Sequence, residues 1–135
     1  MKISIITICL NSEKTIEKTI QSVLSQNYFD IEYIIIDGQS SDSTISIVEK
    51  YKNKISKIVS EQDNGIYFAL NRGINLASGE IVGILHADDF YTNENVLSDV
   101  VKKISEQNSD SLYADLQYIK EDEKVFRNWK SGEYK

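Results

Sequence analysis

The chain has 135 residues, of which 41% are hydrophobic and 27% charged, a composition typical of one globular domain. Its net charge of −6, with arginine only at Arg72 and Arg127, argues against a nucleic-acid partner, because phosphate backbones are bound by clustered Lys and Arg. The one cysteine, Cys9, cannot form a disulfide within the chain, and no apolar run approaches the ~20 residues that cross a bilayer. We therefore expect a cytoplasmic protein.

In chain order, the first predicted element is a buried strand over the apolar, β-branched run 2–8. Ile16, Ile20 and Val23 then follow helical spacing, and Ser12 is placed to cap that helix. Similar runs and spacings predict the later elements. These are strands at 31–36, 55–60 and 80–85, helices at 45–51, 66–76 and 96–104, and a hairpin of strands 112–119 and 124–129 around Glu121–Glu123.

Strands that alternate with helices predict an α/β fold, with a mostly parallel sheet and helices on both of its faces. The chain has no internal repeat, no low-complexity stretch and no proline that could mark a domain boundary. We therefore expect one domain over residues 1–135.

Polar side chains follow each of the first four predicted strands. They are Asn11 after the first, Asp37 after the second, Glu61 and Asp63 after the third, and Asp88 and Asp89 after the fourth. Open α/β sheets bind ligands at the carboxyl ends of their strands, so these positions form the candidate site.

Two interpretations of the pair Asp88 and Asp89 stay open on pattern alone. Mg²⁺ typically takes one or two protein carboxylates together with substrate phosphates, which fits an acidic pair delivered by a strand. Either aspartate could instead cap the helix that follows. Asp37 has a similar choice between contacting a base or ribose and starting a local turn with Gly38.

The remaining candidates are weaker. His86 beside the acidic pair is interpreted as a locally bonded strand-end residue, and Cys9 as a small core residue. The glycines lack the spacing of a phosphate-binding loop, so a metal is the natural way to hold a diphosphate against an acidic protein.

Several segments together resemble family 2 glycosyltransferases of the GT-A type. The motifs are the opening strand 4–11, in which Leu10 replaces a common tyrosine, the helix end Ser22–Gln26, the loop Asp37–Thr44 of form DGxSxDxT, the segment Glu61–Gly73 of form ExDxGIYxAxNxG, and Ser78–Glu80 followed by Asp88 and Asp89. They occur in the family's order and spacing over residues 1–89. A segment at 127–132 is similar to one in polysaccharide-assembly members.

The resemblance implies a role for each matching residue. Thr7, Cys9 and Asn11 are expected to line the nucleotide pocket, Asp37 to contact the base, and Asp63 to lie near the base or ribose. Asp88 is expected to approach the ribose and donor sugar, and Asp89 to coordinate Mg²⁺ or Mn²⁺ bound to the diphosphate.

The implied activity is the inverting transfer of a sugar from a nucleotide-sugar donor, typically a UDP-sugar, to a glycan or lipid-linked acceptor in surface-polysaccharide synthesis. Peripheral association with the inner face of the membrane is compatible with this activity. In this family the general base is an Asp or Glu in a later, acceptor-side segment, which we do not find here. We therefore expect a donor-binding part that lacks its acceptor side and transfers sugar poorly by itself.

Two alternatives from other classes remain. A nucleotidyltransferase also combines carboxylates, a metal and an α/β sheet, but Asn11–Glu13 is unlike its glycine- and arginine-rich loop. A non-catalytic regulatory module, such as a phosphoacceptor receiver domain, has a similar size but places its paired acids after the first strand. The sequence leaves the donor sugar, the acceptor and the oligomeric state undetermined.

Overall fold

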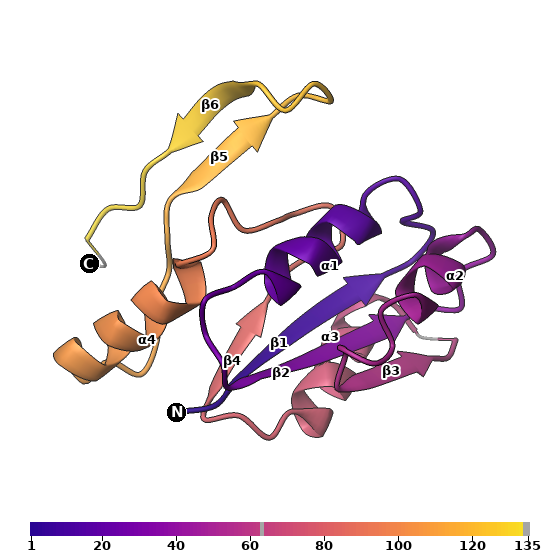
Figure 1. The fold of residues 1–135 in the computed structure, drawn as a ribbon, viewed down its shortest axis with the longest axis horizontal. Coiled ribbons are helices and arrows are strands. Elements are labelled where there is room, and N and C mark those ends of the chain that lie inside the picture. The colour runs from indigo at the N-terminus through magenta and orange to yellow at the C-terminus, as the bar shows by residue number, and fades with distance from the viewer. Residues whose placement is uncertain (63, 134–135) are drawn as a thin grey trace. The chain divides into compact units, whose positions relative to one another are not determined.

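The computed structural model describes residues 1–62 and 64–133, which form two compact units, Met1–Asp99 and Val100–Lys135. The first unit alternates strands with helices (Figure 1). Its elements are β1 (Ile3–Cys9), α1 (Ile16–Leu24), β2 (Ile31–Asp37), α2 (Thr44–Glu49), β3 (Lys57–Ser60), α3 (Ile66–Leu76) and β4 (Ile81–Ile84). The expectation of one domain over residues 1–135 stays a prediction, because a division into compact units does not test it.

The four strands of the first unit form one parallel sheet in the order β3-β2-β1-β4. The register pairs Cys9 with Asp37 and Asp37 with Ser60, so the last residues of three strands lie side by side at one edge. This arrangement confirms the predicted parallel sheet and brings the strand ends together as expected.

Both faces of the sheet are covered by helices, with α1 and α2 on one face and α3 on the other (Figure 1). Side chains alternate between the faces along each strand. Ile6, Ile8, Ile34 and Ile36 pack with Ala69 of α3 on one side. The odd-numbered residues of β1 point to the α1 side, and β1 is buried along its whole length. This explains why the strands are apolar runs without polar alternation.

The start of α1 differs from the prediction that Ser12 caps it. The helix begins at Ile16, with Thr15 at the position before it and no side-chain hydrogen bond capping its end. The chain instead makes a turn in which the amides of Thr15 and Ile16 both donate to the carbonyl oxygen of Ser12. The Ser12 hydroxyl donates to the carbonyl oxygen of Leu10.

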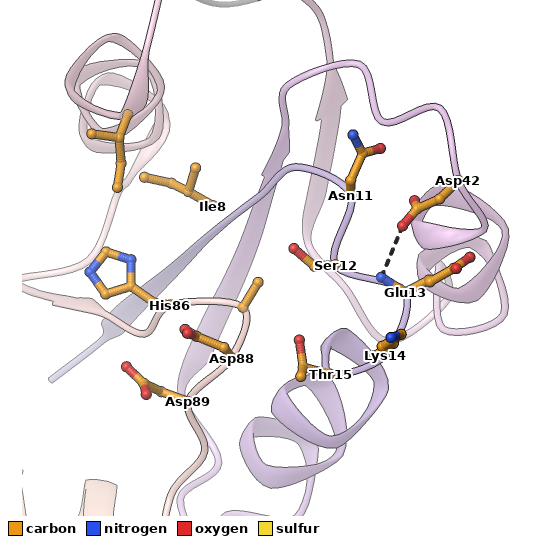
Figure 2. A pocket seen from close by; sticks show the side chains of 12 residues that line it. Ile8, Asn11, Ser12, Glu13, Lys14, Thr15, Asp42, His86, Asp88 and Asp89 are labelled. Atoms are coloured by element: carbon orange, nitrogen blue, oxygen red, sulfur yellow. Dashed lines mark hydrogen bonds between the residues drawn. The ribbon is translucent and has the colours of Figure 1, made fainter. Parts of the chain in front are cut away.

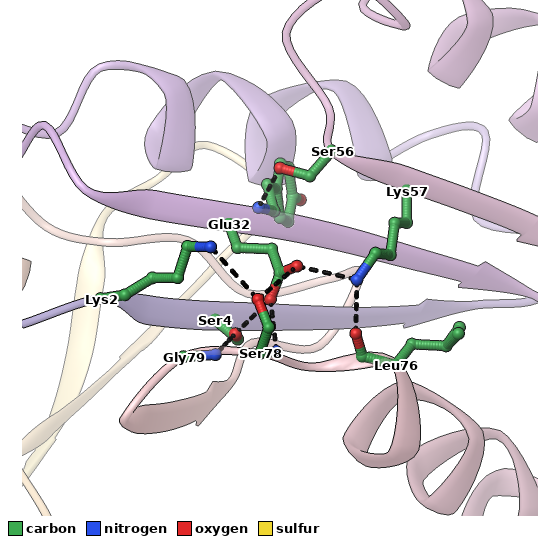
Figure 3. Close-up of polar contacts among 9 residues, drawn as sticks. Lys2, Ser4, Glu32, Ser56, Lys57, Leu76, Ser78 and Gly79 are labelled. Atoms are coloured by element: carbon green, nitrogen blue, oxygen red, sulfur yellow. Dashed lines mark hydrogen bonds and ion pairs between the residues drawn. The ribbon is translucent and has the colours of Figure 1, made fainter.

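At the amino end of the sheet, a buried carboxylate joins several segments (Figure 3). Glu32 of β2 accepts hydrogen bonds from Ser4 of β1 at 2.5 Å and from Lys57 of β3 at 2.8 Å. It also accepts from the Ser78 amide at 2.7 Å, in the loop between α3 and β4. Burial acts to raise the Glu32 pKa, but these hydrogen bonds outweigh it and lower the pKa to about 2.

α4 (Val96–Gln107) crosses the boundary between the units, and the second unit also contains an antiparallel hairpin of β5 (Leu116–Ile119) and β6 (Val125–Trp129). The turn between them is closed by a hydrogen bond from the Lys120 amide to the Lys124 carbonyl oxygen at 3.0 Å. This confirms the predicted hairpin. Across the part of the chain that the structure describes, no helix is both long and apolar enough to span a membrane.

Candidate functional site

A cleft of about 760 Å³ opens at the carboxyl end of the sheet (Figure 2). Its walls come from the loop after β1, the loop after β2, the start of α3 and the turn after β4. The lining residues are Ile8, Asn11, Ser12, Glu13, Lys14, Thr15, Asp42, Ile66, His86, Ala87, Asp88 and Asp89. The cleft lies where open α/β sheets bind their ligands.

The acidic pair lies on a tight turn directly after β4. The Leu85 amide still donates to the Ile6 carbonyl oxygen at 3.0 Å, and the chain then turns so that the Asp89 amide donates to His86 at 3.0 Å. The side chains of Asp88 and Asp89 are exposed to the cleft (Figure 2). The capping interpretation is wrong, because the next helix begins only at Val96.

The two aspartates form a negative site at the mouth of the turn. Partial burial raises the pKa of Asp89, the charge of Asp88 raises it further, and His86 acts in the opposite direction. No lysine or arginine forms an ion pair with either carboxylate within residues 1–62 and 64–133. A divalent cation would relieve this repulsion.

The donor set fits a divalent cation that is shared with a ligand. Among the described residues, no group of three or more His, Cys, Asp or Glu side chains could hold a metal ion by itself. Asp88 and Asp89 can supply carboxylate oxygens, and Mg²⁺ commonly completes its shell with substrate phosphates and water. The residues present therefore fit a metal that binds together with a diphosphate.

The rest of the cleft is also acidic. Glu13 and Asp42 line it together with the aspartate pair, and Lys14 is the one lysine or arginine among the lining residues of the described chain. An anionic ligand entering this cleft meets more negative than positive charge, so a cation bound with it would favour its binding.

The predicted nucleotide residues divide into exposed and buried groups. Asn11 and Asp88 line the cleft, whereas the side chains of Thr7, Cys9 and Asp37 are buried in the sheet. Asp63 lies outside the described residues.

Each buried side chain has a partner within the protein. The hydroxyl oxygens of Thr7 and Tyr33 lie 3.1 Å apart, and the thiol of Cys9 is 3.6 Å from Oδ1 of Asp37. These contacts orient Thr7 and Cys9 inside the sheet. Their roles toward a nucleotide stay predictions.

Asp37 makes a local turn, which is the second of the two interpretations that the sequence left open for it. Its Oδ2 accepts from the Ser40 amide at 3.0 Å and from the Ser60 hydroxyl at 2.7 Å, and its side chain is fully buried. Contact between Asp37 and a base stays a prediction, and it requires a rearrangement of these hydrogen bonds.

The loops after β1 and β2 are joined by reciprocal hydrogen bonds. Oδ2 of Asp42 accepts from the Glu13 amide at 3.2 Å (Figure 2), and Oε2 of Glu13 accepts from the Ser43 amide at 2.9 Å. Asn11 adopts a left-handed conformation with φ of 49°, and its Oδ1 accepts from the Ser41 amide at 2.8 Å. These contacts set the path of the cleft wall 11–15.

Sequence reasoning missed the cleft residues Glu13, Lys14, Thr15, Asp42 and Ile66. Asp42 belongs to the DGxSxDxT loop, so the motif held a signal for it. Ile66 belongs to the ExDxGIYxAxNxG segment, which held a signal for it in the same way. Glu13, Lys14 and Thr15 carried none, because the turn at 12–15 was predicted to be helical from residue 13. That extra turn is what directs these residues into the cleft.

The sequence matches glycosyl transferase family 2 over residues 4–133. A glycosyltransferase of Mycobacterium tuberculosis, itself uncharacterised, is 35% identical over 104 residues, which cover 76% of this chain and 40% of that protein. TarS of Staphylococcus aureus, a poly(ribitol-phosphate) β-N-acetylglucosaminyltransferase, is 36% identical over 117 residues, which cover 83% of this chain and 20% of TarS.

Solved structures show the same architecture. Residues 1–349 of S. aureus TarS in complex with UDP-GlcNAc superpose with a TM-score of 0.75 at 33% identity, covering 82% of this chain and 33% of that one. The mannosyltransferase PcManGT from Pyrobaculum calidifontis, in complex with GDP-Man and Mn²⁺, gives 0.72 at 25% identity, covering 88% and 35%. The predicted α/β, GT-A-like fold is confirmed.

This chain spans less than half the length of each of these proteins. The family match nevertheless covers nearly the whole chain, residues 4–133. The chain belongs to glycosyl transferase family 2.

Proposed function

We propose that this chain binds a nucleotide-diphosphate sugar in the cleft at the carboxyl end of its sheet, through a divalent cation held by Asp89. The observation that carries the proposal is the pair of exposed carboxylates, Asp88 and Asp89, on the turn after β4. The TarS complex with UDP-GlcNAc and the PcManGT complex with GDP-Man and Mn²⁺ support this class of ligand. Family membership favours this activity over a nucleotidyltransferase or a phosphoacceptor module.

Each part of the cleft has a role in this proposal. Asp89 holds Mg²⁺ or Mn²⁺, which when bound neutralises charge that develops on the leaving diphosphate. Asp88 faces the ribose and donor sugar, and the wall 11–15 encloses the nucleotide. Asp37 and Asp63 contribute to recognition of the base, with uracil as the proposed base.

The reaction we propose is transfer of the sugar with inversion to a glycan or lipid-linked acceptor in cell-surface polysaccharide synthesis, at the cytoplasmic face of the membrane. A general base must lie within hydrogen-bonding reach of the acceptor hydroxyl. We assign no residue of this chain to that role. The donor site is therefore the part of the reaction that this chain can test directly.

Calorimetric titration of UDP into the protein tests the donor site, with Mn²⁺ and again with EDTA. We expect binding that depends on Mn²⁺ and that weakens at least about tenfold in Asp89→Asn, since losing even an outer-shell partner of a metal typically costs that much. GDP titrated under the same conditions reports the base preference.

Asp30→Asn provides the matched control for this titration. Asp30 precedes β2 at the opposite end of the sheet, and its substitution makes the same chemical change and the same change in net charge. Equal losses in both variants, or UDP binding that is indifferent to Mn²⁺, would contradict the proposed metal site. If GDP binds more tightly than UDP, the proposed metal site stands, but guanine takes the place of uracil as the proposed base.

A further inference from the structure

Helix α1 carries a row of polar side chains that contact the chain after β4. Thr19, Ser22 and Gln26 are three and four residues apart, which places them along one side of the helix and its continuation. The Ser22 hydroxyl accepts from the Tyr91 amide at 3.2 Å. The Gln26 side chain donates to the Asn93 carbonyl oxygen at 2.7 Å and accepts from the Leu97 amide at 3.0 Å. The row therefore follows the segment 87–97 over most of its length.

Thr19 is the member of this row that reaches the acidic turn. Its side chain is buried, with 1% of its surface exposed. Its hydroxyl lies 2.6 Å from the carbonyl oxygen of Asp89 and 3.0 Å from that of Ala87. The carbonyl oxygen of Thr15, the usual partner of a helical threonine, is farther away at 3.5 Å. The single hydroxyl hydrogen is thus directed out of the helix and into the turn.

Few other hydrogen bonds hold this turn. Strand pairing ends with the bond from the Leu85 amide to Ile6, and the bond from the Asp89 amide to His86 lies within the turn itself. Among the described residues, the Thr19 hydroxyl supplies the hydrogen bonds that tie the backbone at Ala87 and Asp89 to another element. The direction of the two aspartate side chains depends on that backbone.

We propose that Thr19 is a positioning residue, whose hydroxyl holds the backbone of the turn so that the carboxylate of Asp89 faces the cation and that of Asp88 faces the donor. This inference rests on the proposed donor site, because it assigns a role in metal and nucleotide binding to a residue outside the cleft. Side chains that are already held in position bind a metal more tightly, because less of their conformational freedom is lost when the metal binds.

Thr19→Val tests the proposal, since valine matches the shape of threonine but lacks the hydroxyl. It removes the one hydroxyl hydrogen that the carbonyl oxygens of Ala87 and Asp89 share, and we expect the affinity for UDP with Mn²⁺ to fall about tenfold. Amide hydrogen exchange over residues 85–91 of the ligand-free protein should become faster. Thr19→Ser retains the hydroxyl and should restore both the affinity and the slow exchange.

Ser56→Ala separates positioning from a general loss of stability. Ser56 accepts from the Tyr33 amide at 3.0 Å, before the start of β3 and away from the cleft. This variant should lose stability without losing affinity when both are measured under conditions where every protein is folded. A Thr19→Val protein that keeps wild-type affinity, or one whose loss is not restored in Thr19→Ser, would overturn the proposal.

The exchange measurement also separates this proposal from the proposed function. If the wild-type protein binds no nucleotide with Mn²⁺, the donor site fails. Unchanged exchange over 85–91 in Thr19→Val would then show that the hydroxyl does not hold the turn, and would reject the positioning role as well. If exchange is faster in Thr19→Val and slow again in Thr19→Ser, the role of Thr19 in holding the turn stands without the donor site.

Discussion

Cys9 shows how a single residue at the end of a strand becomes part of the interior. Its side chain is buried, with 2% of its surface exposed, and its thiol faces the buried carboxylate of Asp37. Burial raises the pKa of the Cys9 thiol well above its usual value, and the negative charge of Asp37 raises it further. The thiolate is the reactive form, so this cysteine is placed for packing, and its interpretation as a core residue is confirmed.

We expect the folded protein to react with iodoacetamide at pH 8 at least about 100-fold more slowly than the protein unfolded in urea, because both access and thiolate formation are suppressed. Mass spectrometry of the alkylated protein against time measures the two rates. Rapid labelling of the folded protein would show that Cys9 is accessible and that the end of β1 opens in solution.

At the scale of elements, α3 packs against the sheet through a contact that leaves no room for a side chain at Gly73. A Cβ atom built on Gly73 would lie 2.5 Å from Cγ2 of Ile6, whose own side chain is fully buried. Ala69, one turn earlier on the same side of α3, is also buried against this face. The two small residues let the helix approach β1 and β2 closely, and α3 in turn carries Ile66 into the cleft.

Replacing Gly73 with alanine sets two effects against each other. Alanine favours a helix over glycine by about 1 kcal/mol, whereas overpacking a core costs typically 1–3 kcal/mol or more. Because Ile6 cannot move into solvent, we expect a net loss of about 1–2 kcal/mol in the free energy of unfolding, measured by urea denaturation. Gly132→Ala is the control, since nothing lies within 4 Å of a Cβ there. A Gly73→Ala protein as stable as wild type would show that α3 can shift on the sheet.

At the scale of the first unit, a stabilising polar network and the candidate ligand-binding cleft lie at opposite ends of one sheet. The Glu32 network joins β1, β2, β3 and the loop before β4 at the amino end (Figure 3), whereas the cleft lies at the carboxyl end. At the carboxyl end, no lysine or arginine among residues 1–62 and 64–133 forms an ion pair with Asp88 or Asp89. At the amino end the carboxylate is paired with Lys57 and fully hydrogen-bonded, which makes it a stabilising element.

The Glu32 network should make stability depend on pH in a defined window. The pKa of Glu32 is lowered from 4.5 to about 2, so its contribution is complete above pH 4.5 and is lost as the pH falls toward 2. Urea midpoints measured between pH 7 and pH 3 should fall less steeply for Glu32→Gln than for wild type, and the variant should be less stable at pH 7. Parallel pH profiles for the two proteins would show that Glu32 titrates normally in the folded state.

The sequence by itself was enough to predict the type and order of the elements. Long β-branched runs pack well only in a sheet that is covered on both faces, and the helices between them require parallel strands. The approximate location of the site followed as well, because parallel strands bring their carboxyl ends to one edge. Asn11, Asp88 and Asp89 were therefore predicted to lie near one another, and they line the same cleft.

Only the tertiary structure decided which of the predicted residues face that cleft. Thr7, Cys9 and Asp37 are buried because both faces of their strands are covered and because Ser40 folds back onto Asp37, and no local pattern distinguishes them from Asn11. The role of Thr19 was also outside the reach of the sequence. Its partners Ala87 and Asp89 are distant in the chain, and the contact exists only because α1 packs beside the turn after β4.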